Sequence, residues 1–123
     1  MSVNLVWFRR DLRLSDNPAL YDAAQNGKPI VPLFILDENT DSAGAAFKWR
    51  LGLSIKSLSL DLEQHNSKLI LRKGKPLNVL KELNSALGEL SIFWNRQYDE
   101  NSVERDTEIK SYFESLGISV TSR

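Results

Sequence analysis

The chain alternates five short apolar runs with four longer segments whose apolar residues recur at helical spacing, and this alternation limits the fold most strongly. Several of the runs are apolar at consecutive positions, which is typical of strands covered on both faces. Strands that alternate with helices over short connections predict a parallel sheet with right-handed crossovers. The predicted strands span residues 3–8, 29–36, 68–72, 91–95 and 118–121.

The four segments between these runs are predicted to be helices, at residues 18–26, 43–65, 76–87 and 102–116. Asn17 is a typical N-cap, and Pro18 suits the first helical position. Asn101 followed by Glu104 fits a capping box for the fourth helix. A residue that favours left-handed backbone follows each helix: Gly27, Asn66, Gly88 and Gly117. We therefore expect a three-layer, Rossmann-like α/β domain, with a five-stranded parallel sheet in the order 3-2-1-4-5 and helices on both faces.

The composition excludes several classes of function. Sixteen Lys and Arg residues balance 16 Asp and Glu residues, so the basic surface that binds nucleic acid is missing. There is no cysteine for a disulfide or a thiolate site, and the single His65 has no second His for a metal set. No apolar stretch approaches ~18 residues, and the N-terminus lacks a signal-peptide pattern. We expect one soluble, cytoplasmic domain over residues 1–123, without a metal site or a membrane partner.

Two polar loops are predicted to face the same place. In a sheet of this order a ligand binds beyond the carboxyl ends of the strands, where the strand order reverses. The loops at residues 9–17 and 95–102 follow the first and fourth strands and flank that point. The sequence has no Gly-rich phosphate loop, no GxSxG and no HExxH. Nothing therefore indicates one of the usual nucleotide-binding enzymes or hydrolases of this architecture.

The first of these loops opens with a cluster of charge: Arg9, Arg10, Asp11 and Arg13. Two interpretations are open. The alternating charges can form exposed ion pairs at the rim of the sheet, which add little stability. Alternatively, the planar arginine side chains can be committed to a partner surface. Composition alone does not choose between these interpretations.

The stretch LVWFRRDLRLSDNPAL resembles the opening signature of the DNA photolyase/cryptochrome family. A second stretch, FWNRQYDENSVERD, is similar to the family's aromatic-Asn-x-x-Tyr segment and its Arg-Asp pair, here Arg105 and Asp106. The segments AGAAFKWRLGLSIKSLSLDL and LILRKGKPLNVLKEL resemble the family's long second helix and its third strand and helix. The resemblance covers nearly all of the chain. It implies the amino-terminal α/β domain alone, without the helical domain that holds FAD.

The resemblance also implies a light-harvesting role. In this family the α/β domain carries an antenna chromophore, which is methenyltetrahydrofolate in some members and a deazaflavin or a flavin in others. By resemblance, folate meets an Asn-acid pair near the start of the fourth helix. Here the Asn is Asn101, but Ser102 stands in place of the acid. This difference predicts a lower affinity for folate than a complete Asn-acid pair would give. The residues expected to bind the cofactor are Gln97, Tyr98, Asp99, Asn101 and Ser102.

The deazaflavin type places its ring over the carboxyl ends of the strands, near an Arg early in the second helix. Phe47 occupies that place in this sequence, and Trp49 and Arg50 lie beside it. We therefore expect a deep flavin pocket to be crowded, and folate to be the antenna. The resemblance further places the charged cluster of residues 9–13 near the contact with the helical domain. Structural and inter-domain pairing is expected for its members, and a catalytic role for none.

The expected function is therefore the antenna-binding domain of a deoxyribodipyrimidine photolyase, which repairs cyclobutane pyrimidine dimers with light. A cryptochrome photoreceptor shares this domain and is the first alternative. A stand-alone nucleotide-binding module is the second, and the missing phosphate loop argues against it. The chain alone is expected to be inactive, because FAD and damaged DNA both bind through the helical domain. An apolar patch left for that domain predicts some self-association.

Overall fold

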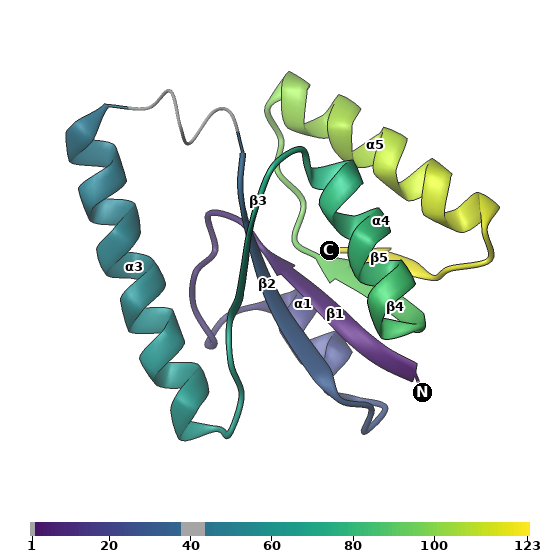
Figure 1. Ribbon diagram of the computed structural model, residues 1–123, viewed down its shortest axis with the longest axis horizontal. Coiled ribbons are helices and arrows are strands. Elements are labelled where there is room, and N and C mark those ends of the chain that lie inside the picture. Colours follow the sequence, from purple (N-terminus) through teal and green to yellow (C-terminus); the bar gives the residue numbers. More distant parts are fainter. Residues whose placement is uncertain (1, 38–43) are drawn as a thin grey trace.

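The computed structural model describes residues 2–37 and 44–123, and Figure 1 shows their arrangement. The predicted alternation of strands and helices is confirmed, with element ends that differ from the prediction by a few residues. Ala43, the predicted first residue of the second helix, lies outside the described residues. The elements are β1 (Ser2–Phe8), α1 (Pro18–Ala23), β2 (Ile30–Leu36), α3 (Ala45–Gln64), β3 (Ile70–Lys73), α4 (Pro76–Leu87), β4 (Glu89–Trp94), α5 (Glu100–Ser115) and β5 (Val120–Ser122).

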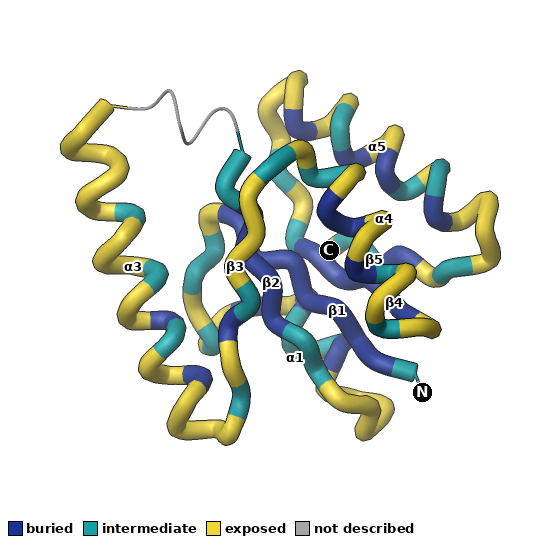
Figure 2. The backbone as a smooth tube through the Cα atoms, in the orientation of Figure 1, coloured by how far each residue is buried: buried dark blue, intermediate teal, exposed yellow. Residues whose placement is uncertain are grey.

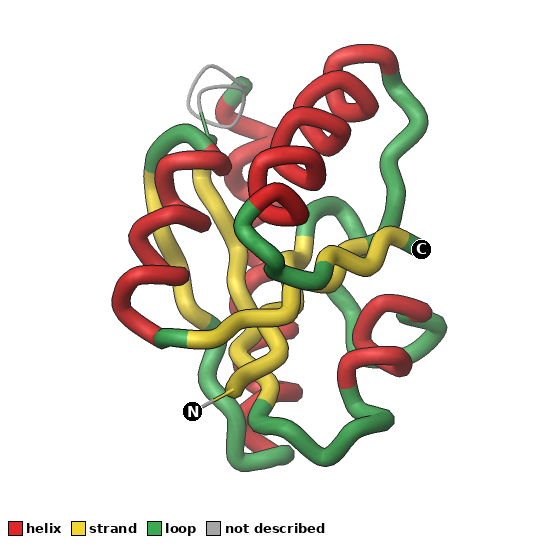
Figure 3. The backbone as a smooth tube through the Cα atoms, turned by 90° about the vertical axis from the view of Figure 1, so that its right-hand side faces the viewer, coloured by secondary structure: helices red, strands yellow, loops and turns green. Residues whose placement is uncertain are grey.

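The strands form one parallel sheet in the order β3-β2-β1-β4-β5, as the sequence predicts. β1 is the central strand: Trp7 lies beside Leu33 of β2, and Val6 lies beside Phe93 of β4. Figure 3 shows the twisted sheet between its helices. The strand order reverses at β1, so the carboxyl ends of β1 and β4 mark the expected place for a ligand.

Successive residues of β1 serve opposite layers of the core, because side chains alternate across a strand. Leu5 and Trp7 pack in the cluster that contains the buried side chains of α4 and α5. Val6 and Phe8 pack in the second cluster, with Ala19 of α1 and the buried leucines of α3. Both faces of the sheet are therefore covered, and this explains why the strands are apolar at consecutive positions.

Most of the predicted helix ends are confirmed. The Asn17 side chain accepts a hydrogen bond from the Leu20 backbone N–H at 3.1 Å and caps α1. Asn66 adopts the left-handed conformation after α3, with a φ of 57°. The prediction for the end of α1 is wrong. The helix stops at Ala23 and a turn follows, so Gly27 ends that turn and not the helix.

The helix α3 departs from the sheet along its length. Leu58 and Leu62 near its C-terminus are buried, whereas Phe47 near its N-terminus is 45% exposed. Leu51 and Ile55 between them are half-buried. Phe47, Leu51, Ile55, Leu58 and Leu62 recur at helical spacing on one side of α3, and this side is packed only in the second half of the helix. The first half forms one wall of a cleft.

Candidate functional site: a cleft at the carboxyl edge of the sheet

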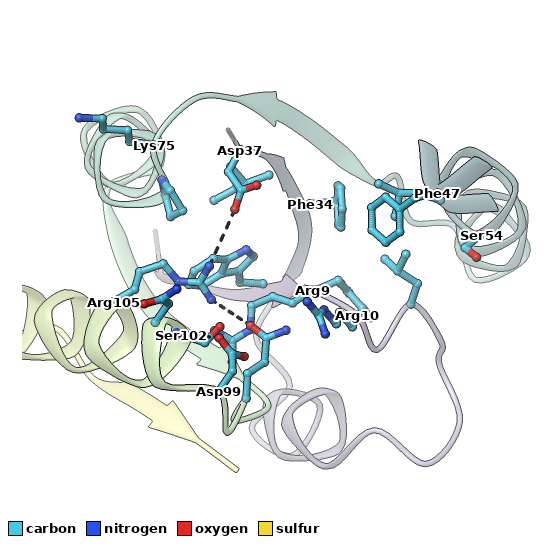
Figure 4. Close-up of a pocket in the computed structure, with 18 of the residues that line it drawn as sticks. Arg9, Arg10, Phe34, Asp37, Phe47, Ser54, Lys75, Asp99, Ser102 and Arg105 are labelled. Atoms are coloured by element: carbon cyan, nitrogen blue, oxygen red, sulfur yellow. Dashed lines mark hydrogen bonds and ion pairs between the residues drawn. The ribbon is translucent and has the colours of Figure 1, made fainter. Parts of the chain in front are cut away.

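A cleft with a volume of about 890 Å³ lies at the carboxyl ends of β1 and β2, between the first half of α3 and the start of α5. Figure 4 shows Phe47 and Ser54 of α3 on one side and Asp99, Ser102 and Arg105 on the other. The volume falls in the range of ordinary small-molecule sites. The described residues contain no cluster of His, Asp or Glu that could hold a metal ion, and no helix among them is long and apolar enough to cross a membrane.

Arg9, directly after β1, is buried beside this cleft. Its Nη1 donates to both carboxylate oxygens of Asp106 at 2.6 Å, and its Nη2 donates to the Asn95 carbonyl oxygen. The guanidinium lies 4.8 Å from the centre of the Trp7 ring. Burial lowers the pKa of Arg9, and the hydrogen bond and charge of Asp106 oppose this shift. Arg9 thus joins β1, β4 and α5 at the base of the cleft.

Asn95, directly after β4, holds the β1–α1 loop in place. Its side-chain amide donates to the Asp11 carboxylate and to Asn17 Oδ1, the second at 2.6 Å. Its side-chain oxygen accepts from the Ala19 backbone N–H at 2.9 Å. Asp11 in turn accepts from the Arg9 backbone N–H at 2.8 Å. Both polar loops therefore meet at one side chain, as the strand order requires.

The charged cluster of residues 9–13 divides into two parts. Arg9 and Asp11 make hydrogen bonds within the domain, so their structural role is established by the geometry. Arg10 and Arg13 are exposed. The expected inter-domain pairing stays a prediction for the cluster, and these two exposed arginines are its strongest candidates.

Asp99, and not Asn101, caps α5. The Asp99 side chain accepts from the Ser102 backbone N–H at 3.0 Å, and the helix begins at Glu100. The predicted capping box at Asn101 and Glu104 is wrong, because Asn101 already lies inside the first turn. Hydrogen bonds from the Ser102 side chain and backbone lower the pKa of the exposed Asp99 carboxyl.

Arg105 is a site residue that the sequence did not single out as a ligand. Its Nη2 donates to Gln97 Oε1 at 3.0 Å, and its Nη1 lies 3.9 Å from an oxygen of Asp37 at the end of β2. Its guanidinium lies 5.1 Å from the centre of the Trp7 ring. This ring is therefore close to two cations, Arg9 and Arg105. The only signal in the sequence was the Arg-Asp pair at the end of the second family motif.

The structure brings together four of the five residues predicted to bind a cofactor. Gln97, Asp99, Asn101 and Ser102 line the cleft. Tyr98 does not, because its side chain is 83% exposed and borders a smaller cleft of about 420 Å³ beside Arg13 and Arg96. Three further cations line the larger cleft: Arg10, Arg50 and Lys75.

The crowding of a flavin pocket stays a prediction, and the structure places the three bulky residues behind it differently. Phe47 and Arg50 line the cleft but leave its volume open. Trp49 is 69% exposed and is not part of the lining. The physical reason is helical rotation, since two residues span about 200° and place Trp49 on the far side of α3 from Phe47.

A five-stranded parallel sheet with a mixed polar and aromatic cleft at its carboxyl edge defines a Rossmann-like α/β domain with a candidate ligand site. The sequence matches the family described as DNA photolyase over residues 4–123. The chain belongs to this family and corresponds to its amino-terminal α/β domain.

The relatives include both photolyases and cryptochromes. A deoxyribodipyrimidine photo-lyase of Agrobacterium fabrum is 37% identical over 96% of this chain, and Cryptochrome-1 of Sinapis alba is 36% identical over 99% of it. The crystal structure of a bacterial class III photolyase from Agrobacterium tumefaciens superposes with a TM-score of 0.91 over 98% of this chain, at 37% identity. The chain spans about a quarter of the length of these relatives, 25% of both Agrobacterium proteins and 26% of the cryptochrome.

Proposed function

We propose that this chain is the antenna-binding domain of a deoxyribodipyrimidine photolyase and that its chromophore binds in the cleft between α3 and α5. The single observation that carries the proposal is this cleft, placed at the reversal of strand order in a member of the DNA photolyase family. The chromophore, when bound, absorbs the light. The chain's own residues bind it, orient it and exclude water.

The lining of the cleft suits a planar heterocycle with polar edges. Ser102 is buried there, and the amides of Gln97 and Asn101 supply both donors and acceptors. Arg105 adds further N–H donors on the same side. Phe47 on α3 supplies an apolar face for a ring. These groups fit the alternating donors and acceptors of a pterin.

The cations at the cleft fit an acidic substituent on the ligand. Arg10, Arg50 and Lys75 are all exposed and line the same cleft. They suit the carboxylates of a folate or the phosphate of a flavin equally well. We propose methenyltetrahydrofolate as the first candidate, because Asn101 matches the Asn of the family's Asn-acid pair, although Ser102 stands in place of the acid.

A flavin is the second candidate, and one specific observation favours it. The crystal structure of an archaeal photolyase from Sulfolobus tokodaii contains two FAD molecules, with the implication of a novel light-harvesting cofactor in that protein. That structure superposes on this chain with a TM-score of 0.82 and 27% identity. The cleft volume of about 890 Å³ lies in the range of small-molecule sites and supports a flavin as a candidate.

An absorbance titration tests the proposal. The chain is titrated with methenyltetrahydrofolate and, separately, with flavin mononucleotide. We expect Ser102→Glu to tighten folate binding, because a carboxylate accepts pterin N–H groups more strongly than a hydroxyl does. Asn101→Ala should weaken it. The exposed Glu104→Ala on the same helix, outside the cleft, is the control. If neither substitution changes the affinity for folate or the flavin, these residues only support the start of α5.

The activity of the complete protein is proposed on the same basis. Repair of pyrimidine dimers requires FAD and damaged DNA, which we assign to a helical domain that this chain would contact through Arg10 and Arg13. The 123-residue chain should not bind tightly the FAD that drives repair, which we assign to the helical domain, and should not repair dimers under blue light. Repair by the purified chain would contradict this. Because the relatives include both photolyases and cryptochromes, a dimer-repair assay on the full-length protein decides between these two functions.

A further inference from the structure

The helix α3 carries a second apolar stripe besides the one that faces the sheet. Trp49, Leu53 and Leu60 are 69%, 49% and 51% exposed. At about 100° per residue, these three side chains leave the helix within about 40° of one another. The buried Leu58 and Leu62 point to nearly the opposite side. The helix is therefore apolar on two faces, and only one of them is packed within the described residues.

This outer stripe, formed by Trp49, Leu53 and Leu60, lies on the outermost element of the molecule. Figure 1 shows α3 at the margin of the domain, and Figure 2 shows that most of its length is exposed. A single exposed Leu or Trp needs no explanation. Three large apolar side chains in one line along one helix are a different case, because such a patch typically marks an interaction surface.

Charged residues flank the outer stripe in a regular order. One flank carries Arg50 near the start of the helix and Asp61 near its end. The other flank carries Lys48 and Glu63 at nearly the same two levels. Bases thus accompany Trp49, and acids accompany Leu60. Two such helices that run in opposite directions therefore place the basic end of each beside the acidic end of the other.

We propose that the outer stripe docks on the outer stripe of a second copy of this chain, as an antiparallel α3–α3 pair. In such a two-fold arrangement each flank meets the same flank of the second copy. Arg50 then lies opposite Asp61 of the second copy, and the apolar Trp49 lies against its Leu60. Leu53 lies close to the two-fold axis. A parallel pair would instead place bases opposite bases and acids opposite acids, at an energetic cost.

The pair is weak for two reasons. A helix of 20 residues is about 30 Å long, so its face buries less than the ~800 Å² per partner of a standard interface. Lys56 also lies along the outer stripe, where its aliphatic stem can pack while its ammonium stays in water. We therefore expect a dissociation constant on the order of 10–100 μM. The proposal does not depend on which ligand binds in the cleft, although Arg50 also lines that cleft.

Sedimentation velocity tests the surface with a matched pair of variants. The chain should show a reversible monomer–dimer equilibrium between roughly 5 and 500 μM, a range that brackets the expected constant. Trp49→Ser should weaken the dimer by at least about tenfold. Tyr21→Ser is the control, because Tyr21 on α1 is 67% exposed and lies outside the outer stripe. A chain that stays monomeric overturns the proposal, and so does equal weakening by both substitutions.

Charge reversal then tests the antiparallel arrangement. Arg50→Glu and Asp61→Arg should each weaken the dimer, because each places two like-charged pairs across the interface. An equimolar mixture of the two variants should restore dimerisation, since a heterodimer brings each new charge opposite its complement. A mixture that dimerises no better than either variant alone contradicts the antiparallel pair. Circular dichroism of each variant checks that α3 is intact.

Discussion

Arg9 on the loop after β1 donates to both carboxylate oxygens of Asp106 on α5, at 2.6 Å, across 97 positions of the sequence. This ion pair is largely withdrawn from water, with side-chain exposures of 6% and 12%. It fixes the start of α5 against the end of the central strand. This buried interaction, together with the packing of Ile109 and Phe113 of α5 in the core, therefore positions the wall of the cleft that carries Ser102 and Arg105.

Asp106→Asn should destabilise the domain by roughly 3 kcal/mol, because it leaves the Arg9 guanidinium buried without its counter-charge. Urea unfolding followed by tryptophan fluorescence measures the change. Glu108→Gln on the same helix is the matched control, since Glu108 is exposed and its loss should cost less than about 0.5 kcal/mol. Equal effects of the two substitutions would show that the Arg9–Asp106 pair does not hold α5.

Asn95→Asp should destabilise the domain by about 2 kcal/mol. The substitution keeps the shape of the side chain but replaces the amide donor with an oxygen that faces the acceptors of Asp11 and Asn17. Chemical denaturation measures the loss, with the exposed Asn78→Asp on α4 as the control. An effect no larger than that of the control would mean that Asn95 does not organise the β1–α1 loop.

Ser102→Ala should raise the pKa of Asp99, because the hydroxyl is the largest cause of its lowered value. The folded-state pKa lies below the ordinary value of 3.8, so the charged carboxylate stabilises the fold above about pH 4. That contribution is lost as the pH falls through the folded-state pKa. Carboxyl ¹³C NMR titration of the two proteins provides the test. An unchanged Asp99 pKa would contradict the assigned hydrogen bond.

The fold could be predicted from the sequence because its signals are local and agree with one another. The apolar runs, the Asn17 cap and the left-handed Asn66 all indicate the same elements. The cap of α5 was misplaced for a local reason as well. Asp99 and Asn101 are both good N-cap residues, and only the hydrogen bond from the Ser102 N–H decides between them.

The site was predicted only in part, because half of it depends on tertiary placement. The loop from Asn95 to Asp99 follows β4 directly and leads into the first turn of α5, so the position of both at the sheet edge could be inferred. The wall formed by α3 could not, since periodicity predicts which side of a helix is apolar but not how closely it packs. The burial of the Arg9 side chain could not be predicted either, because its ion-pair partner Asp106 is remote in the sequence.

Amide NMR mapping of bound methenyltetrahydrofolate, repeated with flavin mononucleotide, tests most directly whether the cleft between α3 and α5 holds the chromophore. We expect ligand-dependent shifts on both walls of the cleft, at Phe47 and Arg50 of α3 and at Gln97, Ser102 and Arg105, with saturable behaviour. Tyr98 and Arg96, on the smaller cleft, should shift little. Shifts that cluster around Tyr98, or no saturable shifts with either ligand, would contradict the assignment of this cleft as the chromophore site.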